Sequence, residues 1–345
     1  TGKVRYAYPI CNVQSGQLNA PVTLNYHGGG IKLREGEGSA GMGWSVSAGG
    51  KTTREVRGFP DDVLTVSEFD NRAGWFVSAA AVDAFQPTAN ETCADFNTIH
   101  NSLSTRDTEP DIFHISAPGL NCSFLFDKNK IIRVFPYEDV VITYETDERG
   151  QIDKFEVVTN TGVKYIFDEL TFTSKLATPH TGSDEPAHFK SEFLNYAKVH
   201  LTTNAGGQDQ YADGIEFYSS WGLSEISSPG FEKITFEYEP NYSGSRSAEW
   251  KTVANAAGTA LDTLYSVNTS VYSRMLKAIQ GKNLTATLKW SGNMISSVTL
   301  TEGTHGDNRT FRFSYVTVRN PSEDVYDGVT LVKEGVSKSF LKSIL

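Results

Sequence analysis

Residues 36–50 read GEGSAGMGWSVSAGG and carry two glycine patterns that are typical of nucleotide-binding loops. One is the G-x-G-x-x-G of residues 36–41, and the other is the GKT of residues 50–52, which ends a Walker-type loop. Such loops hold phosphates only where their glycines lead into a helix whose first amides face the phosphates. The residues that follow therefore decide between a phosphate cradle and a set of turns.

These following residues have the period of a strand. WSVSA at residues 44–48 alternates apolar or small side chains with hydroxyls, which is a two-residue period. Two more glycines come next and would weaken any helix begun there. The Walker spacing also fails, because Ser45 stands five residues before Gly50, where glycine is required. We interpret the glycines as turns, bulges and points of close backbone approach between short strands.

Strand signals continue on both sides of this stretch. PVTLNY at residues 21–26 alternates apolar and polar side chains, and KTTREVRG at residues 51–58 resumes an extended pattern. Residues 28–58 hold ten of the 30 glycines of the chain, so tight turns are expected between these strands.

The composition of the 345 residues favours an all-β fold of mostly antiparallel hairpins, sandwich-like or curved, with few short helices. Aromatic residues make up 12% of the chain, which suits half-buried pleated surfaces. The net charge of −10 repels phosphate backbones and argues against nucleic acid as a partner. No run approaches the roughly 20 apolar residues of a membrane span. The first residues lack the layout of a signal peptide, so either none existed or it has been removed.

Two stretches, APVTLNYHGGGIKL at residues 20–33 and AGMGWSVSAGGKTTREVRGFPDD at residues 40–62, resemble the opening of secreted YD-repeat (Rhs-type) proteins of Bacteroidetes. They are similar, more distantly, to the start of the B component of insecticidal toxin complexes. The matching residues are Pro21, Leu24, Tyr26, Gly41, Gly43, Trp44, Ser45, Gly49, Gly50, Arg54, Glu55, Arg57 and Gly58. In such families this segment is architectural, so the resemblance implies a structural role without catalysis.

Hairpin units occupy much of the remaining chain. Residues 110–136 read as three strands joined by a Pro-Gly turn and a polar turn. Residues 144–169 follow the outline of a YD repeat but carry Phe167 where the tyrosine of the Tyr-Asp pair would stand. Looser units pair residues 223–226 with 234–239, 276–279 with 284–290, and 296–300 with 310–315. Because a single hairpin is marginal, these units are expected to pair edge to edge and share a core.

The predicted organisation has three parts. They are an N-terminal β region over residues 1–177, a loop or linker with a possible short helix over 178–210, and YD-like hairpins over 211–345. Residues 341–344 resemble the first half of another unit, so the chain is expected to be an N-terminal part of a longer polypeptide.

Two stretches have ambiguous patterns. Residues 249–265 have some apolar residues at helical spacing, but Gly258 and the β-branched run after it favour a long hairpin. Residues 78–105 have no clear period and are interpreted as a surface insertion.

No local signature of catalysis, cofactor binding or metal binding is present. The seven histidines form no H-x-H, H-x-x-x-H or H-E-x-x-H pattern, and neither C-x-x-C nor G-x-S-x-G occurs. The sequence therefore predicts no catalytic residue, no cofactor site, no metal site and no enzyme activity. For Cys11, Cys93 and Cys122, three scattered core thiols are favoured over a Cys93–Cys122 bridge.

Two groups of side chains allow either a structural or a chemical interpretation. Asp61 and Asp62 are the most suggestive carboxylates, but a turn or strand cap is favoured over an acid–base pair. Four tryptophans are candidates for a glycan-binding face, although packing within the sheets is favoured. They are Trp75, Trp221, Trp250 and Trp290.

The function that these observations favour is a non-enzymatic structural part of a large secreted or cell-surface YD-repeat-like protein. It would form the wall or platform of a repeat shell for intercellular interaction or toxin delivery, with the downstream repeats of the same polypeptide as partners. The resemblance implies the outside of a Gram-negative bacterium as the location. The alternative is an adhesion module that binds a surface glycan or protein through exposed aromatic rings. An enzyme would need two carboxylates about 5–10 Å apart in an open cleft.

Overall fold

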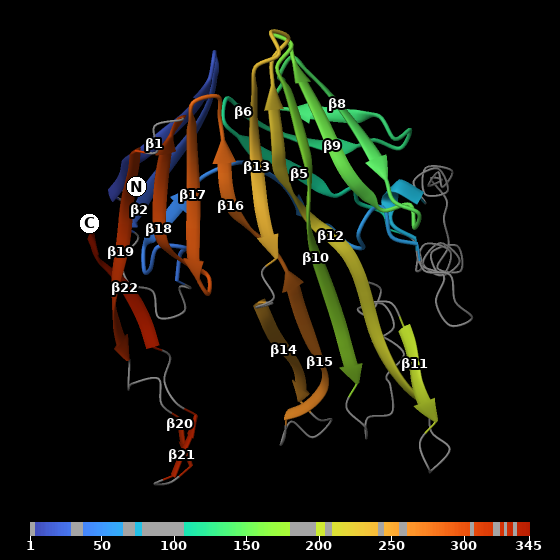
Figure 1. The fold of residues 1–345 in the computed structure, drawn as a ribbon. Helices are drawn as coiled ribbons and strands as arrows, with labels where there is room; N and C mark the ends of the chain where they lie inside the picture. Colours follow the sequence, from blue (N-terminus) through green and yellow to red (C-terminus); the bar gives the residue numbers. More distant parts are fainter. Residues whose placement is uncertain are drawn as a thin grey trace.

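The computed structural model describes residues 4–28, 37–64, 73–77, 107–179, 198–203, 209–240, 245–254, 261–303, 307–319, 325–327, 330–333 and 337–345. Within these ranges the chain is almost entirely antiparallel β-strand, and the one α-helical stretch is a single turn at residues 75–77. The expected all-β class is confirmed. Figure 1 shows long, curved strands that extend downward from a shared upper part.

A small N-terminal sheet forms first along the chain. It contains β1 (Val4–Ser15), β2 (Leu18–Gly28) and β3 (Trp44–Ser47), in that order and all antiparallel. Leu18, Ala20, Val22 and Leu24 alternate with more exposed residues along β2 and are all buried. This period of two gives the sheet one apolar face, which packs on the larger sheet.

The long antiparallel pair of β10 (Lys164–Pro179) and β12 (Asp209–Ser227) is the spine of the large sheet. Along its length, the other edge of β12 pairs in turn with β11 (Lys198–Thr203), β4 (Lys51–Glu55) and β13 (Lys233–Pro240). The other edge of β10 pairs with β9 (Ile152–Thr159) and then with β15 (Leu261–Tyr272). Five further strands thus pair with this spine.

The remaining strands extend this spine sideways as antiparallel neighbours. Beyond the edge of β12, β4 continues into β5 (Ile112–Ala117), β6 (Leu120–Phe126) and β7 (Ile132–Phe135). On the same edge, β13 is followed by β16 (Arg274–Gln280), β17 (Leu284–Ser291), β18 (Met294–Glu302), β19 (Asp307–Arg319) and β22 (Ser337–Ile344). Beyond the edge of β10, β9 pairs with β8 (Val140–Thr146) and β15 with β14 (Ser245–Ala254). A separate pair is formed by β20 (Val325–Asp327) and β21 (Thr330–Lys333).

These pairings confirm the predicted hairpins, including the edge-to-edge succession of the C-terminal units. The hairpin interpretation of residues 249–265 is confirmed for the described part, since β14 and β15 pair antiparallel. Inside the predicted linker 178–210, residues 198–203 form a strand and not part of the possible helix, while residues 180–197 and 204–208 lie outside the described residues. Residues 78–105 also lie outside them, and the three-part division stays a prediction.

The main hydrophobic core fills the space between the sheets, and its centre is aromatic. Five fully buried rings pack at centroid separations of 4.9–6.0 Å, mostly edge to face. They are Phe113, Phe124, Phe126, Phe155 and Trp221. Such pairs each contribute about 0.5–1.5 kcal/mol beyond the burial of their apolar area. Aromatic rings therefore form the centre of the interior.

The glycine-rich stretch carries the chain from the small sheet to the large one. Gly41 has a φ of +91°, and a Cβ there would lie 2.9 Å from the carbonyl oxygen of Ser339 in β22. The next amide, that of Met42, donates to the same oxygen at 2.8 Å. Gly50 passes so close to β5 that a Cβ would lie 2.7 Å from that of Ala117. The interpretation as close backbone approach is confirmed, and no helix follows these glycines.

Replacing Gly41 by Ala should lower the free energy of unfolding by about 2–4 kcal/mol, because the new Cβ is strained at positive φ and collides with β22. Gly150→Ala is the matched control, since Gly150 has a φ of +80° with nothing within 4 Å of an added Cβ. Urea denaturation should give a loss of only about 1 kcal/mol for the control. Equal losses for the two variants would contradict the role of Gly41 at β22.

Candidate functional site

The predicted carboxylates Asp61 and Asp62 lie in a fully buried ionic cluster around Arg54 of β4. The Arg54 Nη1 lies 2.8 Å from Asp62 Oδ1, and Nε lies 2.6 Å from Asp111 Oδ2. The guanidinium also lies over the rings of Phe113 and Phe217, at 5.4 and 5.8 Å from their centroids. A single cation is thus enclosed by carboxylates and aromatic rings, which we call the Arg54 cluster.

The carboxylates of the Arg54 cluster also accept backbone hydrogen bonds from separate segments. Asp62 Oδ2 accepts from the amide of Ile152, at the start of β9, at 2.7 Å. Asp111 Oδ1 accepts from the Arg57 amide at 2.7 Å, and Asp61 Oδ1 accepts from the Asp111 amide at 3.0 Å. The predicted capping role of Asp61 and Asp62 is therefore what their contacts show. These bonds use the oxygens that an acid–base pair would present to a substrate.

Burial makes proton binding favourable in this cluster. Burial, followed by the charge of Asp111, raises the pKa of Asp61 well above its ordinary value, and burial likewise raises the pKa of Asp111 against the opposing effect of Arg54. Nearby Asp107 has its pKa raised to about 7, chiefly by burial. None of these carboxylates lines the groove described below.

Of the four candidate tryptophans, the three whose side chains the structure describes pack within the sheets and do not form an exposed glycan-binding face. Trp221 is fully buried, and its Nε1 donates to the carbonyl oxygen of Ile152 at 2.9 Å. Trp75 and Trp290 are half-buried and donate to backbone carbonyl oxygens in the same way. The side chain of Trp250 lies outside the described residues. The described rings therefore do not form an exposed stacking platform.

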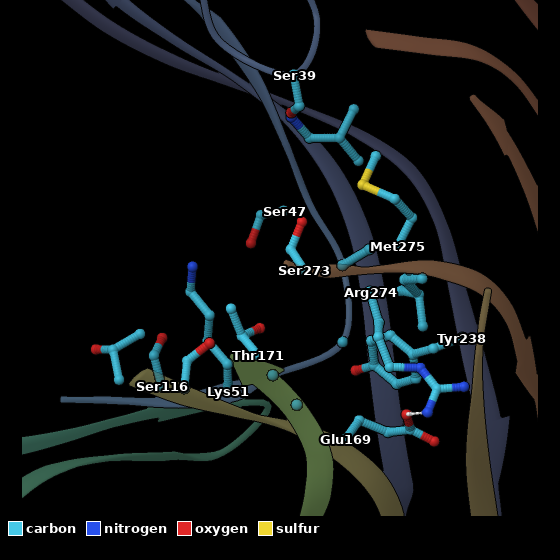
Figure 2. A pocket seen from close by; sticks show the side chains of 18 of the residues that line it. Ser39, Ser47, Lys51, Ser116, Glu169, Thr171, Tyr238, Ser273, Arg274 and Met275 are labelled. Atoms are coloured by element: carbon cyan, nitrogen blue, oxygen red, sulfur yellow. Dashed lines mark hydrogen bonds and ion pairs between the residues drawn. The ribbon is translucent and has the colours of Figure 1, made fainter. Parts of the chain in front are cut away.

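An open groove lies where the glycine-rich stretch crosses the spine, and sequence reasoning did not identify it. Its volume is about 860 Å³, and it is lined by residues from β3, β4, β10, β12 and β16, among others. Figure 2 shows Lys51 and Ser116 on one side of the hollow and Glu169, Arg274 and Tyr238 on the other. No pattern in the sequence joins these segments, since the fold alone brings them together.

The charges of the groove are sparse. Arg274 Nη1 lies 3.0 Å from Glu169 Oε2. The two groups form an ion pair, but the geometry is not that of a hydrogen bond to this oxygen. Burial raises the pKa of Glu169, and Arg274 opposes this effect. Lys51 has no acidic side chain within 4 Å among the described residues. No group of three described His, Cys, Asp or Glu side chains is placed to hold a metal ion.

The structure also bears on the cysteines and on the possibility of a membrane-spanning helix. Cys11 and Cys122 carry free thiols, and Cys93 lies outside the described residues. Among the described residues, none forms a helix long and apolar enough to cross a membrane.

Replacing Arg54 by Met should lower the free energy of unfolding by about 3–5 kcal/mol, because three buried carboxylates lose their counter-ion. Arg57→Met is the matched control, since the Arg57–Glu109 pair spans 3.3 Å with both side chains about half exposed. That pair should contribute about 0–1 kcal/mol. Denaturation of both variants at pH 8 distinguishes them, and near-equal stabilities would overturn the central role of Arg54.

Replacing Asp107 by Asn should flatten the dependence of stability on pH between about 4 and 7. In this window the unfolded Asp107 has released its proton while the folded one, with a pKa of about 7, retains it, so stability falls as pH rises. The amide cannot ionise and removes this contribution. Urea midpoints measured at intervals from pH 4 to 8 test this, and an unchanged slope in Asp107→Asn would refute it.

No family model matches the chain, and no curated protein matches it. Among solved structures, the chain is similar to the N-terminal domain of the effector protein SpvB from Salmonella typhimurium strain LT2, with 11% identity, a TM-score of 0.39, and coverage of 99% of this chain and 97% of that chain. It is also similar to a chain in the crystal structure of TcdB2-TccC3-Cdc42, with 10% identity, a TM-score of 0.30, and coverage of 94% of this chain but 16% of that chain. Likenesses of this size carry no argument about function.

Proposed function

We propose that this chain is a non-enzymatic structural part of a large secreted or cell-surface protein related to YD-repeat proteins, where it forms the wall or platform of a repeat shell. The observation that carries the proposal is the Arg54 cluster. Its members Arg54, Asp61 and Asp62 lie in the same segment, residues 40–62, that resembles the opening of such proteins, and the side chains of the cluster are engaged in joining strands.

The matching residues of that segment have structural contacts throughout. Gly41 fits against β22, Gly50 fits against β5, and Arg54 binds the carboxylates that hold β9 and the approach to β5. Arg57 contributes its amide to the same cluster. A segment whose side chains and glycines are used in this way supports an architectural role.

The distribution of aromatic rings supports the same proposal over the stacking-platform alternative. A wall needs its rings inside to hold curved sheets together, whereas an adhesive face needs them exposed and coplanar. The five central rings, those of Phe113, Phe124, Phe126, Phe155 and Trp221, are fully buried. The described tryptophans are further fixed by hydrogen bonds to backbone carbonyl oxygens.

The groove supports a non-hydrolytic role. Glycoside hydrolysis generally requires two carboxylates about 5–10 Å apart. Glu169 is the one acidic residue among the described residues that line the groove, and it is paired with Arg274. In this proposal the protein acts outside a Gram-negative bacterium, with the downstream repeats as partners, in intercellular interaction or toxin delivery.

Electron cryo-microscopy of the complete natural polypeptide tests the proposal. The strands of residues 1–345 should continue, edge to edge, into a curved wall of further hairpins. Arg54→Met should abolish particle assembly or make the particle protease-sensitive, whereas Arg57→Met should leave it intact. A separate globular unit joined to the remainder by a linker would contradict the shell proposal, as would glycosidase activity of the 345-residue chain.

A further inference from the structure

The strands beneath the groove are irregular in a way that the structural role of the protein does not require. The β10–β12 ladder changes register three times between Ile166 and Phe172, directly along the strands that line the groove. Bulges bend strands and re-aim side chains, and they are frequent beside binding sites. Ser219 lies at one of these irregularities, where it accepts a hydrogen bond from the Thr173 hydroxyl at 2.7 Å.

The lining is rich in hydroxyl groups. Nine of its 24 residues are Ser or Thr, including Ser47, Ser116, Thr171 and Ser220, and two more are Asn. A hydroxyl both donates and accepts, so a wall of hydroxyls matches a ligand whose own groups do both. Sugars are ligands of that kind. A volume of about 860 Å³ lies within the usual range of about 300–1,000 Å³ for small-molecule sites.

Lys51 gives the groove a positive charge. Its side chain extends from β4 into the hollow between Ser116 and Thr171 (Figure 2). The charged lining residues are Lys51, Arg274 and Glu169, so the groove carries +2 − 1 = +1 in a chain of net charge −10. Because Arg274 is already paired with Glu169, the ammonium of Lys51 is the charge available to a ligand. An anionic group is therefore the complement.

An extended peptide is a poorer fit than a saccharide. A peptide that adds to a sheet needs a row of free backbone groups on the strand edge. On the side of β3 away from β2, the Trp44 amide donates to the Gly41 carbonyl oxygen at 3.1 Å, and the Val46 amide donates to Ser39 Oγ at 2.8 Å. Residues 38–41 thus cover this edge. Recognition in the groove falls to side chains.

We propose that this groove binds an acidic saccharide, with its carboxylate on the Lys51 ammonium and its hydroxyls on the surrounding Ser and Thr side chains. The inference goes beyond the proposed structural function and stands without it, because it depends on the groove alone. It assigns the segment GGK at residues 49–51 a carboxylate-bearing sugar as ligand in place of a nucleotide phosphate.

Isothermal titration of the 345-residue chain tests the assignment with three acidic saccharides: trigalacturonate, sialyllactose and an unsulfated hyaluronan tetrasaccharide. At least one should bind, and at least tenfold more tightly than neutral maltotriose. Lys51→Gln should weaken this binding at least tenfold, whereas Lys342→Gln, which removes an exposed lysine of β22 outside the groove, should leave it unchanged. Raising the salt concentration should weaken binding as well.

A variant that blocks the groove and an acidic peptide provide two further tests of the proposed ligand. Ser47→Trp places a ring in the groove from an exposed position of β3 and should abolish binding while the melting temperature is retained. Failure of all three acidic saccharides to bind would overturn the proposal, as would equal binding by Lys51→Gln. Binding of a triglutamate peptide as tight as that of the acidic saccharide would assign the site to peptides instead and overturn it equally. None of these results depends on whether a shell forms.

Discussion

The burial of one guanidinium constrains the rest of this structure. A charge that is fully removed from water is tolerated only where counter-ions and hydrogen bonds replace its solvation. Around Arg54 these come from Asp62 and Asp111, which are held in turn by the amides of Ile152, Arg57 and Asp61. Segments that are 90 and 164 residues apart in the chain therefore meet at one point. The close passage of the glycine-rich stretch brings β4 to that point.

The local features of the fold follow from local sequence patterns. Alternation and turn residues predict the hairpins β5–β6 and β16–β17 and the β14–β15 pair, because their partners are near in sequence and their faces are half-buried. The glycine-rich stretch is likewise predicted as turns and close approaches, since strand periodicity follows it. The capping role of Asp61 and Asp62 is predicted in kind, but not their shared guanidinium.

The non-local features leave no such trace. Arg54 and Asp111 are 57 positions apart, and nothing in the sequence links them. The succession of β11, β4 and β13 along one edge of β12 depends on the curvature of the spine, which its bulges set. The groove is missed for the same reason, since serines and threonines on five strands form no motif. Lys51 has a signal in the sequence as part of an apparent Walker ending, but the glycine spacing of that ending does not fit a phosphate-binding loop.

The contacts that join the sheets and the groove proposed to bind a ligand lie on different sides of the glycine-rich stretch where it crosses the spine. The backbone of residues 41–50 joins the sheets, and the side chains beneath it cap strands and bury charge. The side of the crossing that faces solvent carries the hydroxyl groups of the groove and the ammonium of Lys51. In our proposal, Lys51 gives the groove its preference for an anionic ligand.

Hydrogen exchange measured by mass spectrometry tests the central role of the Arg54 cluster most directly. The amides of Arg57, Asp61 and Ile152 donate to its carboxylates. They should exchange as slowly as amides in the middle of the β10–β12 ladder, through global unfolding alone. Exchange at the rate of a surface loop at these three amides, with the ladder still protected, would contradict the account.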